Sequence, residues 1–138
     1  MTQDEKEAFL AGVHVGVLSI PRGVSEAPLT APLWYDYTPG GELWFVVGKT
    51  SRKAAVLSEG GRVSLCAQDE RMPYRYVSVE GNVVSIRQSD GHLEPMAIRY
   101  LGEEMGQQYA AGSDEPGNVV VSVQPDTWLA VDYGKAAL

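Results

Sequence analysis

Three cationic and two hydroxyl side chains lie within five residues, where an expected strand leads into an expected helix: Lys49, Thr50, Ser51, Arg52 and Lys53. The whole chain has only eleven Lys and Arg residues and a formal net charge of −7, so this concentration is unusual. Cations in the first turn of a helix lie at the positive end of its dipole, which is unfavourable unless an anion binds there. Phosphate is the usual anion, and the hydroxyls add donors for it. The segment therefore predicts a phosphate site, with a solvated surface turn as the alternative interpretation.

The strand expected at residues 28–38 has one unusual face. Its residues alternate with a period of two, which places Thr30, Pro32, Trp34 and Asp36 on the face opposite Leu29, Ala31, Leu33, Tyr35 and Tyr37. A rigid proline and a large aromatic side chain beside backbone groups suit the binding of a flat heterocycle. For Trp34 the alternative is an ordinary place in the core.

The remaining pattern predicts a mainly β protein with peripheral helices. A first helix is capped by Thr2 or Asp4, runs to Leu10 and stops at Gly12. Strands are expected at 13–20, 28–38, 42–48, 62–68, 76–86, 118–123 and 127–133, with 28–38 and 42–48 forming a hairpin and Gly81 marking a bulge or barrel corner. A short helix follows the cationic segment, and a long one runs from Ser89 or Asp90 to about Tyr109. Antiparallel strands in this order favour a barrel, although a sandwich remains open.

Composition excludes several classes of protein. At 138 residues we expect a single domain, residues 1–138, and the net charge of −7 disfavours nucleic acid as a partner. Residues 1–9 lack the pattern of a secretory signal, and no apolar stretch has the length of a membrane span, so we expect a cytoplasmic protein without a membrane partner. One cysteine, Cys66, and two histidines predict neither a disulfide nor a metal site.

Several segments together resemble the pyridoxamine 5'-phosphate oxidase-like split β-barrels. They are LTAPLWY at 29–35, GELWF at 41–45, KTSRK at 49–53 with Leu57 after it, and RVSL at 62–65. The segments PYRYVSVEG at 73–81 and DYGK at 132–135 are most similar to the B branch of the flavin/deazaflavin oxidoreductases. The resemblance covers nearly the whole chain. It rests on the order and spacing of these segments.

This resemblance implies an antiparallel, FMN-binding-like split β-barrel. It also implies a homodimer with two cofactor sites at the subunit interface, each binding coenzyme F420 or, in some relatives, FMN. By similarity, the cofactor phosphate would be held at the cationic segment by Lys49, Ser51, Arg52 and Lys53, with Thr50 among them. The cofactor ring would be flanked by Pro32, Leu33 and Trp34. Arg75 is expected at the cofactor tail or the partner subunit, and Trp128 and Lys135 are expected to close the pocket from the other subunit.

Three functions follow as hypotheses. The first is F420-dependent hydride transfer to a small unsaturated or conjugated substrate, and the second is the same type of reaction with FMN. The third is a protein that binds or sequesters a cofactor or haem without turnover, since fold alone does not decide function. The cofactor supplies the chemistry of hydride transfer, so no catalytic side chain is assigned. The proton donor stays open among Tyr35, Tyr74, Tyr76 and water.

Overall fold

The computed structural model describes residues 1–135. Its first element, α1 (Gln3–Ala11), is capped by Thr2, one of the two residues that the sequence offers as a cap, and the cap is a capping box. The Glu5 backbone N–H donates to Thr2 Oγ1 at 3.2 Å, and the Thr2 N–H donates to Glu5 Oε1 at 2.9 Å. These two bonds satisfy donors that the first helical turn leaves free. The helix ends at Gly12 and buries Phe9 and Leu10 against the sheet.

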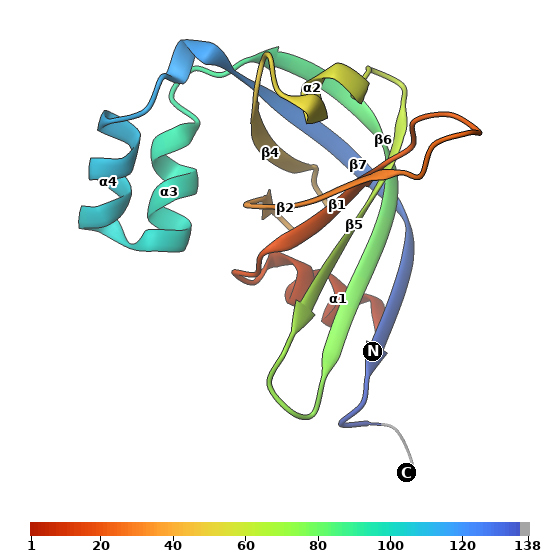
Figure 1. Cartoon of the computed structure of the whole chain (residues 1–138). Helices are drawn as coiled ribbons and strands as arrows, with labels where there is room; N and C mark the ends of the chain where they lie inside the picture. The colour runs from red at the N-terminus through yellow and green to blue at the C-terminus, as the bar shows by residue number, and fades with distance from the viewer. Residues whose placement is uncertain (136–138) are drawn as a thin grey trace.

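Seven strands form one antiparallel sheet in the order β2-β1-β5-β6-β7-β4-β3. Their bounds are β1 (Gly16–Ile20), β2 (Leu29–Leu33), β3 (Asp36–Tyr37), β4 (Leu43–Gly48), β5 (Arg62–Asp69), β6 (Arg75–Gln88) and β7 (Asn118–Asp132). β2 and β3 form the two opposite edges, yet only Trp34 and Tyr35 separate them in sequence. The edges must therefore approach each other, and the sheet curls into a barrel (Figure 1). We call residues 34–35 the closing segment.

The inside of the barrel holds the hydrophobic core. Alternate residues of each strand point inward, as in β4, where Leu43, Phe45 and Val47 are buried. Tyr35 of the closing segment is 0 % exposed, and its hydroxyl donates to the Leu10 carbonyl at 2.7 Å. Tyr35 therefore both belongs to the segment that closes the barrel and holds α1 against the sheet.

The expected strand 28–38 is divided in the structure. β2 pairs with β1 over its whole length, from Leu29 opposite Ile20 to Leu33 opposite Gly16. Only β3 pairs with β4, through Asp36 and Tyr37. The predicted hairpin is therefore limited to two residue pairs, because the chain leaves one sheet edge at Leu33 and joins the other at Asp36. The alternation of faces holds across the break, with Tyr35 and Tyr37 buried and Pro32 exposed.

The two strands expected after residue 118 are one strand, β7. It runs through Pro125, which lies opposite Gly81 of β6 at a shift of register. A bulge tolerates proline because the ladder needs no N–H donor at that point. The shift of register between Glu80 and Gly81 confirms the predicted bulge, and glycine is needed there because a Cβ atom would lie 2.1 Å from the carbonyl oxygen of Gln124.

The expected long helix is a helical hairpin. α3 (Leu93–Leu101) ends at Gly102, whose φ of 88° lies in the left-handed region, and α4 (Glu103–Ala111) follows directly. The two helices lie side by side next to the barrel (Figure 1). They approach closely at Gly106, where a Cβ atom would lie 2.5 Å from the Ile98 Cα. A short 3-10 turn, η1 (Glu115–Gly117), leads into β7. Within residues 1–135, no helix has the length and apolar character needed to cross a membrane.

Candidate functional site

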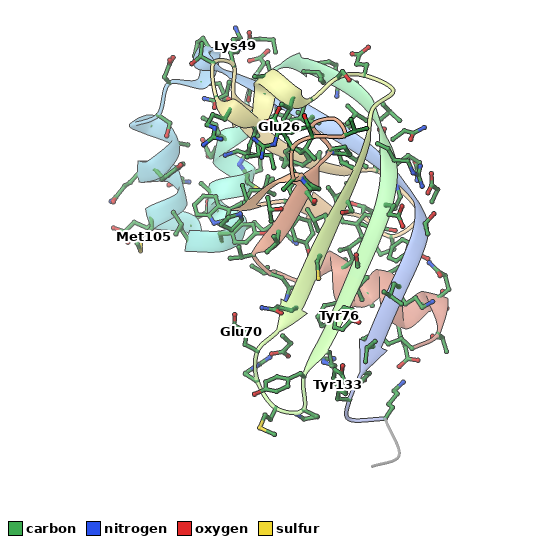
Figure 2. The ribbon with its side chains drawn as sticks, turned by 45° about the vertical axis from the view of Figure 1, so that its right-hand side comes forward. Glu26, Lys49, Glu70, Tyr76, Met105 and Tyr133 are labelled. Atoms are coloured by element: carbon green, nitrogen blue, oxygen red, sulfur yellow. The ribbon has the colours of Figure 1, made fainter. Side chains whose placement is uncertain are left out.

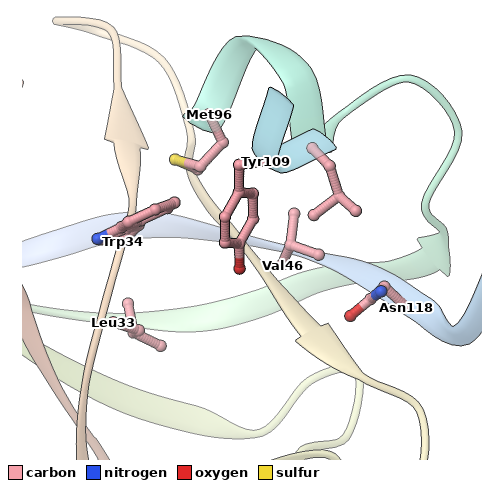
Figure 3. A pocket seen from close by; sticks show the side chains of 7 residues that line it. Leu33, Trp34, Val46, Met96, Tyr109 and Asn118 are labelled. Carbon is pink, nitrogen blue, oxygen red and sulfur yellow. The ribbon is translucent and has the colours of Figure 1, made fainter. Parts of the chain in front are cut away.

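A pocket of about 320 Å³ lies between the outer wall of the barrel and the α3–α4 hairpin (Figure 3). It is lined by Leu33, Trp34, Val46, Leu93, Met96, Tyr109 and Asn118. Val46 alternates with the buried Phe45 and Val47 of β4, so it faces outward from the barrel core. The lining is aliphatic and aromatic apart from one amide and one phenol, a composition typical of small-molecule sites.

Sequence reasoning found two of these lining residues. Leu33 and Trp34 were expected to flank a cofactor ring, and both line the pocket. Pro32, the third residue of that group, is exposed and is not part of the lining. Tyr109 is expected only as the end of one long helix. Its place in the pocket depends on the turn at Gly102, which brings α4 back over α3.

The cationic segment 49–53 follows β4 directly. Ser51 caps the short helix α2 (Arg52–Val56) by accepting from the Ala54 N–H at 3.1 Å, and its hydroxyl donates to the Gly48 carbonyl at 2.7 Å. The single hydroxyl proton of Ser51 is thereby used inside the turn. Ser51 fixes the shape of the segment. The Lys49 N–H donates to the Gly117 carbonyl at 2.9 Å and ties the segment to the start of β7.

The cations of this segment are electrostatically uncompensated. Elsewhere in the chain, carboxylates within 4.0 Å pair with Arg22, Arg62, Arg71, Arg75, Arg99 and Lys135. Over the described residues 1–135, no such pair involves Lys49, Arg52 or Lys53. These three cations are therefore free of ion pairs within the described chain and can contact an anion.

Strand β4 connects the pocket to the cationic segment. Val46 lines the pocket, and Lys49 follows three residues later, which is roughly 10 Å along an extended chain. Gly48 pairs with Asn118, another residue of the pocket lining. One ligand can therefore span both features, with a flat apolar part in the pocket and an anionic group at Lys49.

Arg75 lies elsewhere in the single chain. It begins β6 and pairs with Asp132 at the end of β7, whereas the pocket adjoins Asn118 at the start of β7. In Figure 2, Lys49 lies at one end of the barrel, and Tyr76, the neighbour of Arg75, lies toward the other. The Arg75 guanidinium donates to Asp69 at 3.0 Å and stacks 5.1 Å from the centre of the Phe9 ring. Its expected contact with a cofactor tail or a partner subunit stays a prediction.

The two weaker expectations also concern this second region. Trp128 packs edge-on against Tyr37, with 5.9 Å between ring centres, and Lys135 pairs with Glu5. A cavity of about 380 Å³ near α1 is lined by residues that include His14 and Arg75. Burial lowers the pKa of His14, although its bond to the Phe9 carbonyl opposes the shift. The His14 ring is therefore neutral at pH 7.

Aromatic rings form one wall of the pocket. The Trp34 indole stacks on the Tyr100 ring of α3 with 5.0 Å between centres and an angle of 7°. Tyr109 of α4 lies 5.3 Å from Trp34 at an angle of 51° (Figure 3). Burial raises the pKa of Tyr100, so its phenol is neutral at physiological pH. The sequence gives no signal that Tyr100 and Trp34, which are 66 residues apart, stack on each other.

Known proteins share this architecture. The family model described as pyridoxamine 5'-phosphate oxidase matches residues 2–132. Among solved structures, an F420 reductase is 23% identical with a TM-score of 0.66, covering 89% of this chain and 94% of its own. A conserved hypothetical protein of Mycobacterium tuberculosis is 24% identical with a TM-score of 0.73, covering 100% and 91%. A putative pyridoxamine 5'-phosphate oxidase of Listeria innocua is 19% identical with a TM-score of 0.69, covering 95% and 98%. No curated protein matches the chain.

Proposed function

Since the chain belongs to the pyridoxamine 5'-phosphate oxidase family, we propose that it is an oxidoreductase with a phosphorylated flavin-type cofactor beside the α3–α4 hairpin. The observation that carries this proposal is that β4 lines an apolar, aromatic pocket through Val46 and leads directly into the segment 49–53, whose three cations form no ion pair among residues 1–135. A flavin-type cofactor combines these two chemistries, a flat ring system and an anionic chain. When bound, it supplies the hydride transfer.

In this proposal, the side chains of the protein bind the cofactor and orient it. Lys53 and Arg52 neutralise the phosphate, Ser51 holds the turn in shape, and Trp34 provides a flat wall for the ring. The α3–α4 hairpin shields one side of the pocket from water. Hydride transfer benefits from a dry, preorganised pocket and needs no charged side chain in the lining.

We propose coenzyme F420 as the cofactor and a small unsaturated or conjugated molecule as the substrate, with FMN as the alternative cofactor. The similarity to the fold of an F420 reductase supports this choice. The long anionic tail of F420 would require a basic track beyond Lys53. Within one chain Arg62 is engaged by Asp126 at 2.6 and 2.8 Å, and Arg75 lies at the far end of the barrel, so Arg52 is the free candidate. A tail that leaves the pocket past Arg52 would fit this arrangement.

We also propose that two copies pair through the outer face of the barrel. The strand registers align Pro32, Val17, Cys66, Ser78 and Leu129 in one row across five strands. This row carries no charge, and its large members stay accessible, with Val17 37 % and Leu129 60 % exposed. An uncharged, exposed row across a sheet is typical of an interface between protein surfaces. The mass of the protein in solution, measured by light scattering, tests this pairing.

The function is tested by titrating the cofactor-free protein with F420 and, separately, with FMN, and following fluorescence. Micromolar or tighter binding of either cofactor supports the site, and the preference between them identifies the cofactor. Lys53→Ala should weaken binding by roughly 1.5 to 3 kcal/mol, more than tenfold in Kd, because a charged hydrogen bond to phosphate is lost. Lys6→Ala, a cation on α1 outside the segment, is the matched control and should leave Kd unchanged.

Two outcomes would contradict the proposal. An unchanged Kd in Lys53→Ala would remove the phosphate assignment. Failure of the wild-type protein to bind F420 and FMN would leave the non-enzymatic alternatives, and a haem titration followed by absorbance would then be the next measurement. Binding followed by oxidation of reduced cofactor in the presence of quinones or enones would support turnover.

A further inference from the structure

Tyr100 is bound to the closing segment through both its ring and its hydroxyl. The hydroxyl oxygen accepts from the Tyr35 N–H at 3.1 Å, and it lies 2.6 Å from the His14 carbonyl and 3.0 Å from the Tyr35 carbonyl. A phenol has one proton to donate, and the shorter distance assigns it to His14. The ring of the same residue stacks flat on Trp34. One side chain therefore joins α3, the approach to β1 and the pocket wall.

The neighbouring Arg99 donates to the carbonyl that receives no proton from the Tyr100 hydroxyl. Its Nε donates to the Tyr35 carbonyl at 3.1 Å, so that oxygen is satisfied without the Tyr100 proton. Its guanidinium also donates to the Ala11 and Gly12 carbonyls at 3.1 and 2.8 Å, at the end of α1. Arg99 thus anchors the backbone of the closing segment, whereas Tyr100 stacks flat on Trp34 and Tyr109 meets the indole at a tilt.

Hydrogen bonds hold the α3–α4 hairpin in place at its base and near its turn. At its base, Glu115 accepts from the Ser89 hydroxyl and from the Leu93 N–H at 3.4 Å. Near the turn at Gly102, Arg99 and Tyr100 make the contacts described above. The pocket lies between these two anchors, so the distance between hairpin and barrel depends on them.

We infer that Tyr100 is a positioning residue of the pocket, because its hydroxyl fixes the closing segment and its ring holds the Trp34 indole in the orientation that forms the wall. The expected effect on cofactor binding rests on the proposed function. The dependence of the Trp34 orientation on the Tyr100 hydroxyl does not rest on it. Without the hydroxyl, the backbone N–H of Tyr35 loses its acceptor and the backbone carbonyl of His14 loses its donor. Trp34 can then change its orientation on the ring of residue 100.

Tyr100→Phe is the direct test, since it keeps the stacked ring and removes the hydroxyl. Tyr37→Phe is the matched control: Tyr37 is 4 % exposed, donates to Glu7 at 2.7 Å, and packs against a different tryptophan, Trp128. Both variants lose one hydroxyl with short hydrogen bonds, so we expect similar decreases in Tm. Protein labelled with 5-fluorotryptophan gives one fluorine resonance for each of the three tryptophans. The Trp34 signal is assigned by its loss in Trp34→Phe.

We expect Tyr100→Phe to shift or broaden the Trp34 resonance, and Tyr37→Phe to change the Trp128 resonance and leave Trp34 unchanged. Kd, measured separately with FMN and with F420, should rise at least about fivefold in Tyr100→Phe and change less than about twofold in Lys6→Ala, the control for binding. Tyr100→Leu, which also removes the stacked ring, should raise Kd further.

An unchanged Trp34 resonance in Tyr100→Phe would overturn the inference, and so would a change in Kd no larger in Tyr100→Phe than in Lys6→Ala. If wild-type protein binds neither FMN nor F420, the proposed function fails. The fluorine comparison alone then decides whether Tyr100 positions Trp34. The two failures are thereby distinguishable.

Discussion

Replacing Gly106 by alanine should separate the two helices of the hairpin. The added Cβ atom would lie 2.5 Å from both the Cα and the N of Ile98, whereas ordinary contacts begin near 3.4 Å. The obstructing atoms are backbone atoms, so no side-chain rotation relieves the overlap. The helices must move apart by about 0.9 Å, the difference between these two distances.

Two energetic effects oppose each other in this variant. Alanine is a better helix former than glycine by about 1 kcal/mol, which favours Gly106→Ala. Overpacking of a close contact costs typically about 1 to 3 kcal/mol, and contact with rigid backbone belongs at the upper end of that range. We therefore expect a net loss of about 1 to 2 kcal/mol in the free energy of unfolding. The same displacement moves Tyr109, one turn further along α4, away from Trp34 and should weaken cofactor binding.

Urea denaturation followed by circular dichroism measures this loss, and Gly112→Ala is the matched control. Gly112 follows α4 with φ −88°, and a Cβ atom there would meet the Gln108 carbonyl at 3.6 Å, an ordinary contact. This control should change stability by less than about 0.5 kcal/mol. If Gly106→Ala proves as stable as Gly112→Ala, the close approach of α3 and α4 is wrong.

Two further predictions concern partly buried polar side chains. Arg99→Met should lower the free energy of unfolding by about 2 to 4 kcal/mol in urea denaturation, because it unpairs Asp36 and leaves carbonyls near α1 without a donor, whereas Arg99→Lys should lose less. Burial lowers the pKa of His14 in the folded protein below its value in the unfolded chain. The unfolded chain therefore binds a proton at this residue more readily, so His14 stabilises the fold above the ordinary pKa of histidine. This stabilisation is lost as the pH falls from that value toward the folded pKa. His14→Gln should therefore show a smaller loss of stability than wild type between about pH 7.5 and pH 5.5, and equal losses in the two proteins would refute the assignment.

Local signals in the sequence predicted much of the fold. The cap at Thr2, the bulge at Gly81 and the alternation through Tyr35 and Tyr37 all depend on residues close in sequence, and the structure confirms them. The junction of β4 with the cationic segment is likewise a local feature, so the phosphate hypothesis had a definite place before the fold was known. The short helix expected after this segment is α2, and Ser51 caps it.

The errors have one physical cause, which is that short-range patterns do not report how distant segments meet. Apolar residues recur at helical spacing on both sides of Gly102, so periodicity alone favoured one long helix, and the positive φ of that glycine turns the chain instead. Pro125 suggested a break between strands, yet Gly81 on the neighbouring strand accommodates it. The contribution of Tyr109 to the site depends on these long-range arrangements.

The closing segment has a kinetic consequence. β2 and β3 are nearly contiguous in sequence, but five other strands lie between them in the sheet, so we expect Trp34 and Tyr35 to reach their places after the other strands have paired. Contacts between such distant residues form late and slow the folding of β-rich chains. Trp34 is also a wall of the pocket, so a partly folded chain has no complete binding site. We therefore expect the chain to become able to bind a ligand in the same step that completes folding. A ligand added during refolding can stabilise only chains that have closed the barrel.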